Sequence, residues 1–519
     1  MNAARTATIA ATDTTMNQRT LLALTLLTLT LRAQAETFVV TRLDDPMPGG
    51  CLTDDCSLRE AALAANANDA FTGTDTIQLA AGTYTLTGGP LTPDSGLSLV
   101  GAGATQTHVI TDVALFNAVI GKALSMRGMS IQTTAFDLLT AYDDSHLLLN
   151  DVAVPVGGGA ILAGGAGSSL EVHDSEFRGV LACSQSPGTC TIVDSSMADF
   201  YAVPDGGGPV VLIQRSIVDG NLDPGAVPAP AVVLHGGTTT IEDSTITHTA
   251  GLHIRSEIGQ QVNLLRVRYI DNNGPISTHV YADVTIKDSE LRDNNSRAIY
   301  ADSAAHVEIS GSSFIHNSVD DNAGGAVLAE HGANVSISNS TFSGNSFSVT
   351  AAQAGARGAA IGYRNGGGAY INLRHVTIVA PTIAPFGIQG LGIGGFGGVG
   401  DAAIRVTNSI LAGSCHLDAV ALLQDNADIE SPGNTCGLTS ANSLVSVSSS
   451  SLALGTLGDH GGPTPTYAPA TTSVALDAAV TPLCLDFDQR GYTRPFGAGC
   501  DIGAVEIGSS DRIFADGFQ

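Results

Sequence analysis

A phrase of alternating apolar and polar positions recurs through the middle of the chain. It runs apolar, polar, apolar, two polar residues, Ser, any residue, apolar. Copies are LEVHDSEF (170–177), TTIEDSTI (239–246), VTIKDSEL (284–291), VEISGSSF (307–314) and VSISNSTF (335–342). A period of two is the side-chain period of a β-strand, and strand formers dominate the phrase. The middle of the chain is therefore predicted to consist of strands.

The Ser position of the phrase serves as a marker for counting repeats. The marker falls at Met129, Val152, Ser175, Ser195, Ser216, Ser244, Val267, Ser289, Ser312, Ser340, Val376 and Ser409. Successive markers lie 20 to 36 residues apart, which is typical of a solenoid. A strand phrase that recurs once per coil predicts an all-β fold, a parallel β-helix of about 12 coils. With a rise of about 4.8 Å per coil, the rod is about 50 Å long.

The alternation also assigns side chains to the inside and outside of the rod. In VTIKDSEL, the residues Val284, Ile286, Ser289 and Leu291 are expected inside. The Ser markers should stack at a corner, where a small hydroxyl can bond backbone groups that the turn leaves free. Five residues after the marker lies a second column, expected to form an asparagine ladder: Asn221, Asn272, Asn294, Asn317 and Asn345.

Composition excludes several classes of function. The 519 residues carry 22 Lys and Arg against 49 Asp and Glu, a net charge of −27. Phosphate backbones need a basic surface, so nucleic acid is excluded as a partner. The only lysines are Lys122 and Lys287, and no Gly-rich stretch ends in GKS or GKT, so a P-loop is excluded as well. The hydrophobic content of 43% can supply a large core.

The N-terminal segment has the features of a secretion signal. An apolar run at 20–31, TLLALTLLTLTL, follows Arg19 and precedes an A-x-A motif that ends at Ala35. We expect translation to start at Met16 and cleavage to fall between Ala35 and Glu36. The run is too short to span a bilayer, and a buried core helix is the alternative. We expect the mature chain to have no transmembrane helix.

Eight cysteines fit an exported protein. They fall into local pairs: Cys51 with Cys56, Cys183 with Cys190, Cys415 with Cys436, and Cys484 with Cys500. The sequence leaves the connectivity open, and local pairing is the simplest interpretation because each pair brackets a loop rich in Gly, Pro or polar residues. None of the pairs has C-x-x-C spacing, so a zinc site is not favoured.

A short helix is predicted near the N-terminal end. Ser57 precedes the apolar segment LREAALAANA, and Glu60 stands three residues after it, which is the spacing of a capping box. A helix over the first coil would cover the open edge of the β-helix, which otherwise invites aggregation.

Both ends of the chain resemble known families. The CSLREA stretch (56–61) resembles the N-terminal CSLREA domain of bacterial exported proteins. Four segments resemble the choice-of-anchor Q domain: LGDHGGPT (457–464), ALDA (475–478), DQRG (488–491) and CDIGAVE (500–506). GGA phrases at Gly324 and Gly367, with FxxN at 314–317 and 342–345, are similar to repeats of polymorphic outer membrane proteins. The resemblance implies a right-handed β-helix, secreted or displayed at the cell surface or outer membrane of a Gram-negative bacterium.

These features predict a division of the chain into five parts. They are 1–35, upstream residues and signal peptide; 36–95, a CSLREA-type cap; 96–414, the right-handed β-helix; 415–507, a choice-of-anchor Q-like module; and 508–519, a C-terminal tail.

Four residues after the marker lies the sharpest candidate site. The column is His248, Asp271, Asp293 and His316, and it is expected to face outward beside the asparagine ladder. Adjacent carboxylates about 5 Å apart would repel each other. Flanking imidazoles could bind a metal or move protons. The alternative is a solvated turn, because turns favour Asp and Asn.

Two further acidic groups could hold Ca²⁺ weakly. One precedes the marker and consists of Asp151, Asp174 and Asp194; the other is Asp320, Asp321 and Asn322. No established Ca²⁺-binding loop motif supports either group, so no cofactor is expected beyond Ca²⁺.

We therefore expect an exported, non-catalytic β-helix that acts as an adhesin or a carbohydrate-binding scaffold. Its partner would be an extracellular glycan or a host or cell-surface protein. The alternative is a polysaccharide lyase or glycoside hydrolase that uses the His248 to His316 column on the side of the rod.

Overall fold

The computed structural model describes residues 35–508. The gaps within this range are 69–72, 156–158, 185–187, 204–207, 223–231, 256–258, 321–323, 348–357, 365–367, 381, 384–387, 390, 397–402 and 417–421. Three sequence predictions therefore concern residues outside the described part: the signal peptide before Ala35, the tail after residue 508, and Asp321 with Asn322.

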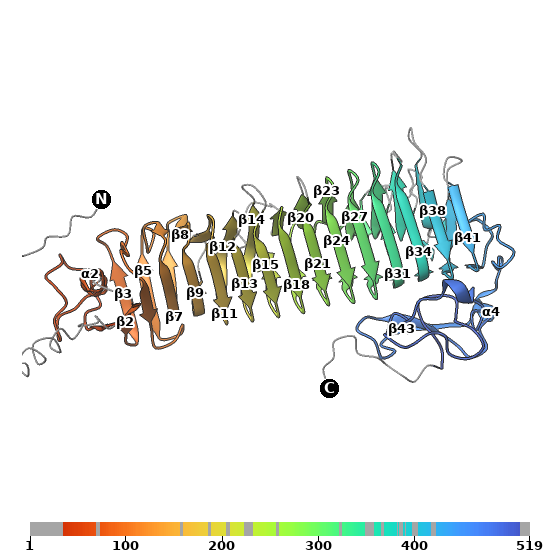
Figure 1. Ribbon diagram of the computed structural model, residues 1–519. Coiled ribbons are helices and arrows are strands. Elements are labelled where there is room, and N and C mark those ends of the chain that lie inside the picture. The colour runs from red at the N-terminus through yellow and green to blue at the C-terminus, as the bar shows by residue number, and fades with distance from the viewer. Residues whose placement is uncertain are drawn as a thin grey trace, which may run out of the picture.

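The chain folds into a long rod of stacked coils, coloured from red to blue in Figure 1. In the described part of the chain, 38 strands form one hydrogen-bonded network, and every pairing within it is parallel. Each full coil contributes three strands, so the rod has three faces, which we call A, B and C in chain order. The predicted all-β parallel β-helix is confirmed.

Face A carries the recurring phrase and begins the coils. Its strands are β1 (Thr37–Val40), β2 (Asp75–Leu79), β4 (Leu97–Val100), β7 (Ala123–Thr133), β9 (His146–Val154), β11 (Ser169–His173), β13 (Thr189–Val193), β15 (Val210–Gln214), β18 (Thr238–Glu242), β21 (Gln261–Leu265), β24 (Asp283–Lys287), β27 (His306–Ser310), β31 (Asn334–Ser343), β34 (Tyr370–Val379), β38 (Ala403–Thr407) and β41 (Leu422–Asn426). The ends of β7, β9, β31 and β34 continue into face B.

Face B follows a corner directly after the phrase. Its further strands are β3 (Gly82–Leu86), β5 (Thr107–Thr111), β12 (Glu176–Ser184), β14 (Ser196–Val203), β16 (Ile217–Asp219), β19 (Thr245–Thr247), β22 (Arg268–Ile270), β25 (Glu290–Arg292), β28 (Ser313–Ile315), β39 (Ile410–Ala412) and β42 (Ile429–Ser431). The ends of β12 and β14 continue into face C.

Face C completes each coil before the chain returns to face A. Its further strands are β6 (Val119–Ile120), β8 (Asp137–Tyr142), β10 (Ala160–Ala163), β17 (Val232–His235), β20 (Leu252–Arg255), β23 (Ile276–His279), β26 (Ile299–Ala301), β30 (Val327–Glu330), β33 (Ile361–Arg364), β37 (Leu391–Phe396) and β40 (Ser414–His416). The network thus extends from β1 to β42, across residues 96 and 414, and the proposed domain limits stay a prediction.

Smaller elements lie outside this network. They are the pairs β29 (Ser318–Val319) with β32 (Ser346–Phe347), β35 (Thr382–Ile383) with β36 (Ile388–Gln389), and β43 (Leu454–Gly458) with β44 (Thr466–Pro469), and the helices α2 (Leu58–Ala67), α4 (Ser449–Leu452), η1 (Gly220–Leu222) and η2 (Thr481–Leu483).

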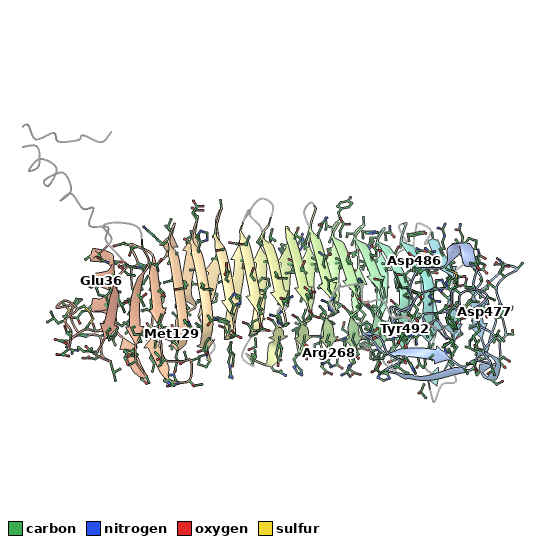
Figure 2. All side chains as sticks on the ribbon, turned by 60° about the horizontal axis from the view of Figure 1, so that its bottom comes forward. Glu36, Met129, Arg268, Asp477, Asp486 and Tyr492 are labelled. Atoms are coloured by element: carbon green, nitrogen blue, oxygen red, sulfur yellow. A yellow bond between two sulfur atoms is a disulfide. The ribbon has the colours of Figure 1, made fainter. Side chains whose placement is uncertain are left out.

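The core fills the inside of the rod. In VTIKDSEL the residues Val284, Ile286, Ser289 and Leu291 are buried, as the alternation predicted, and their neighbours in sequence are more exposed. Apolar side chains at equivalent positions of successive coils form one continuous core, and stacked Phe314 and Phe342 are 4.5 Å apart between ring centroids. Polar side chains cover the outside along the rod (Figure 2).

The Ser markers form the predicted column at the corner between faces A and B. The hydroxyl of each marker accepts a hydrogen bond from the backbone N–H of the marker one coil before it. The N–H of Ser195, for example, donates to Ser216 Oγ, and that of Ser216 donates to Ser244 Oγ. Each of these hydroxyls donates in turn to the carbonyl two residues before its own. The corner thus satisfies backbone groups that face inward.

The asparagine ladder is present at the corner between faces B and C. Asn272, Asn294, Asn317 and Asn345 are buried, and each side-chain oxygen accepts from the backbone N–H of the ladder residue one coil earlier. The prediction for Asn221 is wrong. It lies exposed in η1, within a coil that carries an insertion. Thr249 continues the ladder instead, because its N–H and hydroxyl both donate to Asn272 Oδ1.

The helix α2 caps the first coil, as the sequence predicted. Ser57 Oγ accepts from the N–H of Glu60, and the Glu60 carboxylate accepts from the N–H of Ser57 at 2.8 Å. Arg59 holds the loop before the helix through a paired contact with Asp45, with both N–O distances at 2.8 Å. The CSLREA residues therefore fix the helix on the open edge of the rod.

Four disulfides join the cysteines as local pairs. They are Cys51–Cys56, Cys183–Cys190, Cys415–Cys436 and Cys484–Cys500. The local pairing that the sequence favoured is confirmed. Disulfides of this number are typical of proteins that fold outside the reducing cytosol. A search of the described helices finds none long and apolar enough to cross a bilayer.

Candidate functional site

The predicted column of His248, Asp271, Asp293 and His316 lies at the corner between faces B and C. The register of β19, β22, β25 and β28 places the four residues one above another. All four have a left-handed backbone, with φ between 52° and 55°. Asp and Asn tolerate this conformation better than most residues. The corner geometry therefore gives a structural reason for these residue types.

The side chains of this column do not form one cluster, because its two histidines pair with different aspartates. His248 Nδ1 lies 2.9 Å from Asp219 Oδ1, outside the column, while His316 Nδ1 lies 3.5 Å from Asp293 Oδ1. Asp293 also pairs with Arg292 at 2.5 Å. The side chains of His248 and His316 are exposed. This arrangement fits a solvated turn, and a catalytic role of the column stays a prediction.

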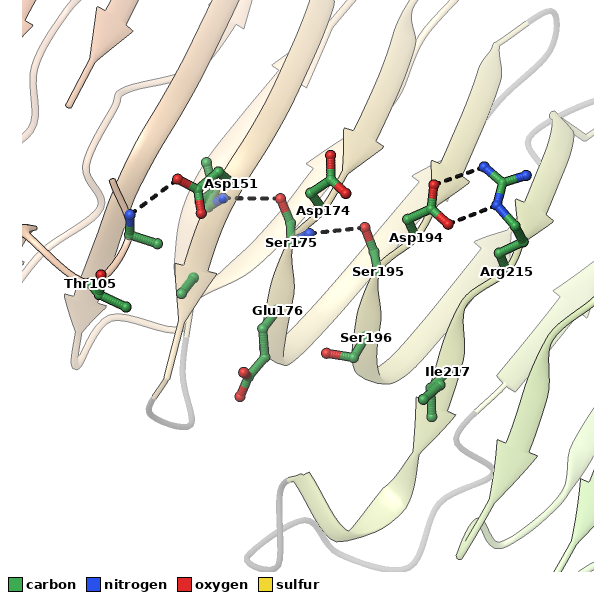
Figure 3. Close-up of a pocket in the computed structure, with 13 residues that line it drawn as sticks. Thr105, Asp151, Asp174, Ser175, Glu176, Asp194, Ser195, Ser196, Arg215 and Ile217 are labelled. Atoms are coloured by element: carbon green, nitrogen blue, oxygen red, sulfur yellow. Dashed lines mark hydrogen bonds and ion pairs between the residues drawn. The ribbon is translucent and has the colours of Figure 1, made fainter. Parts of the chain in front are cut away.

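The acidic group before the marker lies at the other corner, between faces A and B. Asp151 lies within β9, and Asp174 and Asp194 directly follow β11 and β13 at the equivalent position of the register; each has φ near 50°. One coil further on, Arg215 occupies the same position and binds both carboxylate oxygens of Asp194 at 2.7 and 2.8 Å. No hydrogen-bond or ion-pair partner of the Asp174 carboxylate lies among the described residues (Figure 3).

These aspartates line a groove that runs along the rod, which we call the acidic groove. One part has a volume of about 660 Å³ and is lined by the three aspartates, Glu176, Ser196, Arg215 and the loop at Ala104 and Thr105 (Figure 3). A second part, of about 500 Å³, shares Ala104, Thr105 and Ala153 and continues along face B. Its polar lining is Thr83, His108, Ser130 and Gln132. The sequence suggested the carboxylates but not the groove, because the loop that borders the groove beside Asp151 comes from an earlier coil.

A row of rings on face C was missed by the sequence analysis. His235, His253, His279 and Tyr300 lie on β17, β20, β23 and β26, with successive ring centroids 5.9, 5.1 and 5.6 Å apart. Burial, together with the neighbouring imidazoles of His279 and His235, lowers the pKa of His253. Tyr300 donates its hydroxyl to Glu330 Oε2 at 2.7 Å.

Among the residues that the structure describes, two groups of side chains have the residue types and spacing of metal ligands. The first is His375, Cys484 and Cys500, but these two cysteines form a disulfide and have no thiolate to offer. The second is Asp302, Glu330 and His331 at the end of face C.

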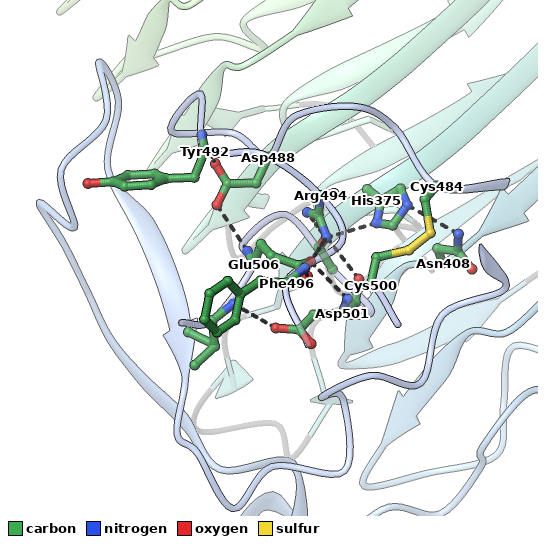
Figure 4. Close-up of polar contacts among 12 residues, drawn as sticks. His375, Asn408, Cys484, Asp488, Tyr492, Arg494, Phe496, Cys500, Asp501 and Glu506 are labelled. Carbon is green, nitrogen blue, oxygen red and sulfur yellow. Dashed lines mark hydrogen bonds and ion pairs between the residues drawn. A yellow bond between two sulfur atoms is a disulfide. The ribbon is translucent and has the colours of Figure 1, made fainter. Parts of the chain in front are cut away.

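The motifs similar to the choice-of-anchor Q domain hold the C-terminal module together. Arg494 and Glu506 form a fully buried ion pair at 2.8 Å, and Arg494 also donates to the carbonyls of Asp501 and Gly503 (Figure 4). In the DQRG segment, Arg490 pairs with Asp488 at 2.7 Å. These motif residues bond to each other and to backbone, so their role in this chain is structural.

The module lies against the side of the rod rather than at its end (Figure 1). The module forms hydrogen bonds with the corner between faces A and B on four successive coils. The corner residues are Gly311, Asn339, His375 and Asn408. Gln489 reaches across the corner, accepting from Thr341 Oγ1 and donating to the Ser312 carbonyl. The same corner column therefore forms a groove near the N-terminal end and a docking edge near the C-terminal end.

Comparison with known proteins agrees with the fold. Residues 200–378 match the family model described as the right handed beta helix region. No curated protein sequence matches the chain significantly. The strand network is thus a right-handed parallel β-helix.

Solved structures of similar shape were also found. The A-module of mannuronan C-5 epimerase AlgE6 from Azotobacter vinelandii is 13% identical, with a TM-score of 0.32, over 75% of this chain and 93% of that chain. The pectate lyase Pel9A is 12% identical, with a TM-score of 0.26, over 91% and 96%. The Agl-KA catalytic domain is 13% identical, with a TM-score of 0.28, over 75% and 68%. At this level of likeness no activity is carried over.

Proposed function

We propose that the protein is an exported, non-catalytic β-helix that binds an extracellular glycan in the acidic groove. In this proposal residues 16–35 are a signal peptide, the CSLREA-type cap closes one end, and the choice-of-anchor Q-like module docks on the side of the rod toward the other end. The four disulfides support folding outside the cytosol.

The observation that carries the proposal is the shape and lining of the groove. Its polar side chains recur on successive coils about 4.8 Å apart, so the groove follows the rod axis and suits an extended polymer. Carboxylates, hydroxyls and an amide can bond the hydroxyl groups of sugars. The negative charge of the aspartates favours neutral or amino sugars over polyanions, unless a cation such as Ca²⁺ bridges the two.

The placement of the carboxylates argues for binding rather than cleavage. Glycoside hydrolysis needs two carboxyl groups on either side of the scissile bond. Here Asp151, Asp174 and Asp194 form a single column on one wall, and Arg215 pairs with Asp194. The other carboxylate of the lining, Glu176, pairs with Arg178 at 3.1 Å. Such a wall can align a chain along its length without flanking one bond.

The proposal is tested by measuring glycan binding to the mature chain. On a panel of neutral and amino-sugar polysaccharides, the wild type should bind at least one polymer. Asp174→Asn keeps a residue that tolerates a left-handed backbone, and it should weaken that binding about tenfold, which corresponds to about 1.4 kcal/mol. The control is Asp288→Asn, which changes a left-handed residue of the same corner column outside the groove.

Four results would contradict the proposal. The absence of binding to any polymer, or equal effects of the two substitutions, would remove the groove as the binding site. Release of reducing ends or unsaturated products would show that the protein is an enzyme. Recovery of the intact chain from the cytoplasm after cell fractionation would contradict export.

A further inference from the structure

Four potential metal ligands meet where face C turns back into face A. His279 and Glu330 are the last residues of β23 and β30, and Asp302 directly follows β26. The register pairs Thr278 with Ala301 and Ala301 with Ala329, so the residue after each of these falls into one column. His331 comes next in the chain after Glu330, with φ at 44°. Three successive coils therefore contribute to one spot.

The ligand atoms of Asp302, Glu330 and His331 are close enough for one ion, and His279 lies beside Asp302. His331 Nδ1 lies 2.7 Å from Asp302 Oδ1, and His279 Nδ1 lies 3.5 Å from Asp302 Oδ2. One ligand atom each from Asp302, Glu330 and His331 all lie within 4.8 Å of one another. Ligands about 2.0 to 2.2 Å from a metal are about 3 to 4 Å apart, so small side-chain rotations suffice.

Neighbouring groups already orient the carboxylates. The N–H of Ser303 donates to Asp302 Oδ1 at 2.7 Å, and Tyr300 donates its hydroxyl to Glu330 Oε2 at 2.7 Å. Bonds of this kind around a metal site fix the ligands in place and tune their affinity. The spot is thus arranged by residues that are not ligands themselves.

Burial favours a divalent cation at this spot and leaves it a route of entry. Glu330 is 2% exposed and the Asp302 side chain 16%, whereas the His331 side chain is 53% exposed. A buried carboxylate beside a partly buried one gains from a bound cation. An ion would enter past His331 from solvent.

We propose that His279, Asp302, Glu330 and His331 form a divalent transition-metal site, with Zn²⁺ the best-fitting ion. Two imidazole nitrogens and two carboxylate oxygens suit Zn²⁺ in a tetrahedral arrangement, whereas Ca²⁺ prefers six to eight oxygen ligands. The ion joins three successive coils at their edge. This site is separate from the acidic groove, so the test of metal binding does not depend on the outcome of the glycan-binding test.

The test is metal binding by the tag-free mature chain after treatment with a chelator. Isothermal titration calorimetry with ZnCl₂ should show one equivalent of Zn²⁺ bound. Co²⁺ should give the intense visible absorption of a tetrahedral N/O site. His331→Ala and Asp302→Asn should each weaken Zn²⁺ binding at least tenfold. Zn²⁺ should raise the melting temperature of the wild type and not that of either variant.

The control is His316→Ala, which removes an exposed histidine with a left-handed backbone from a different corner. It should leave Zn²⁺ affinity unchanged. His331 is mostly exposed, so its truncation leaves the core intact, and circular dichroism of each variant checks this. The absence of Zn²⁺ binding would overturn the proposal. So would equal affinity in all variants, or an equal loss in His331→Ala and His316→Ala.

Discussion

Residues in the left-handed conformation set the chemistry of two corners of this rod. The position before the marker is left-handed in coil after coil and holds Asp, Asn, Gly, Arg or His. Most other residues pay about 1 to 2 kcal/mol there, so Asp, Asn and Gly recur for a backbone reason. Arg215 and Arg266 are accommodated because each pairs with an aspartate one coil earlier. The turn geometry is thus the first cause of the acidic columns, and one stretch of them borders the acidic groove.

The buried asparagines should contribute measurably to stability. Asn317→Ala removes the acceptor for Asn294 and the donor to the Leu291 carbonyl, and leaves these buried groups without partners. Such a loss costs about 2 kcal/mol, and guanidinium denaturation should show a correspondingly lower free energy of unfolding. The matched control is Asn295→Ala on the exposed side of the same corner, which should change it by less than about 0.5 kcal/mol. Equal losses in the two variants would mean that the ladder adds nothing.

At the scale of elements, the strands of faces A and B could be predicted from the sequence, whereas the strands of face C could not. Faces A and B are joined by a corner of constant length, so markers, asparagines and both left-handed columns keep a fixed spacing in sequence. His253, His279 and Tyr300 lie 9, 12 and 11 residues after their markers, because the loop before face C varies in length. Without a constant offset, sequence alone cannot show that these side chains share a face.

The helix α2 protects the first edge of the rod. Ala61 is fully buried between α2 and the first strands, whereas Leu63 on the same helix is 45% exposed. Ala61→Glu places a charge in the packed interface, so it should detach the helix and expose the edge strands to self-association. Size-exclusion chromatography with light scattering should show oligomers for Ala61→Glu and a wild-type profile for the control Leu63→Glu. A monomeric Ala61→Glu would assign the edge protection to other residues.

At the scale of the whole molecule, we expect low pH to weaken the docking of the C-terminal module on the rod. His375 is fully buried between rod and module; its Nδ1 faces the Gly503 carbonyl at 3.3 Å and its Nε2 accepts from Asn408 Nδ2 at 3.1 Å. These contacts suit the neutral ring. Burial, aided by the charge of Arg494, lowers the pKa of His375 to about 2.

The direction of the pH effect follows from this shift. In the unfolded or undocked chain His375 takes up a proton below its ordinary pKa of about 6.5, and in the docked state it does not. The contribution of His375 to docking is therefore complete above about pH 6.5 and is lost as pH falls toward 2. Between pH 6.5 and 5.0 the loss amounts to about 2 kcal/mol.

Hydrogen exchange of peptides spanning 480–508 measures this docking. Relative to the variant His375→Gln at the same pH, the wild type should lose protection progressively from pH 6.5 to 5.0. The Gln side chain is neutral throughout, so its own protection should not follow that window. A wild type and variant that respond to pH in parallel would show that other groups control docking.

The sequence by itself determined the coil. Period-two alternation fixed which side chains face inward, marker spacing fixed the stacking, and the capping box fixed the helix at the N-terminal end, because each of these depends on residues close together in the chain. Tertiary structure decided the sites. The acidic groove, the metal-ligand group at His279 to His331 and the docking of the module bring together residues from different coils, and loops of unequal length set how those coils align.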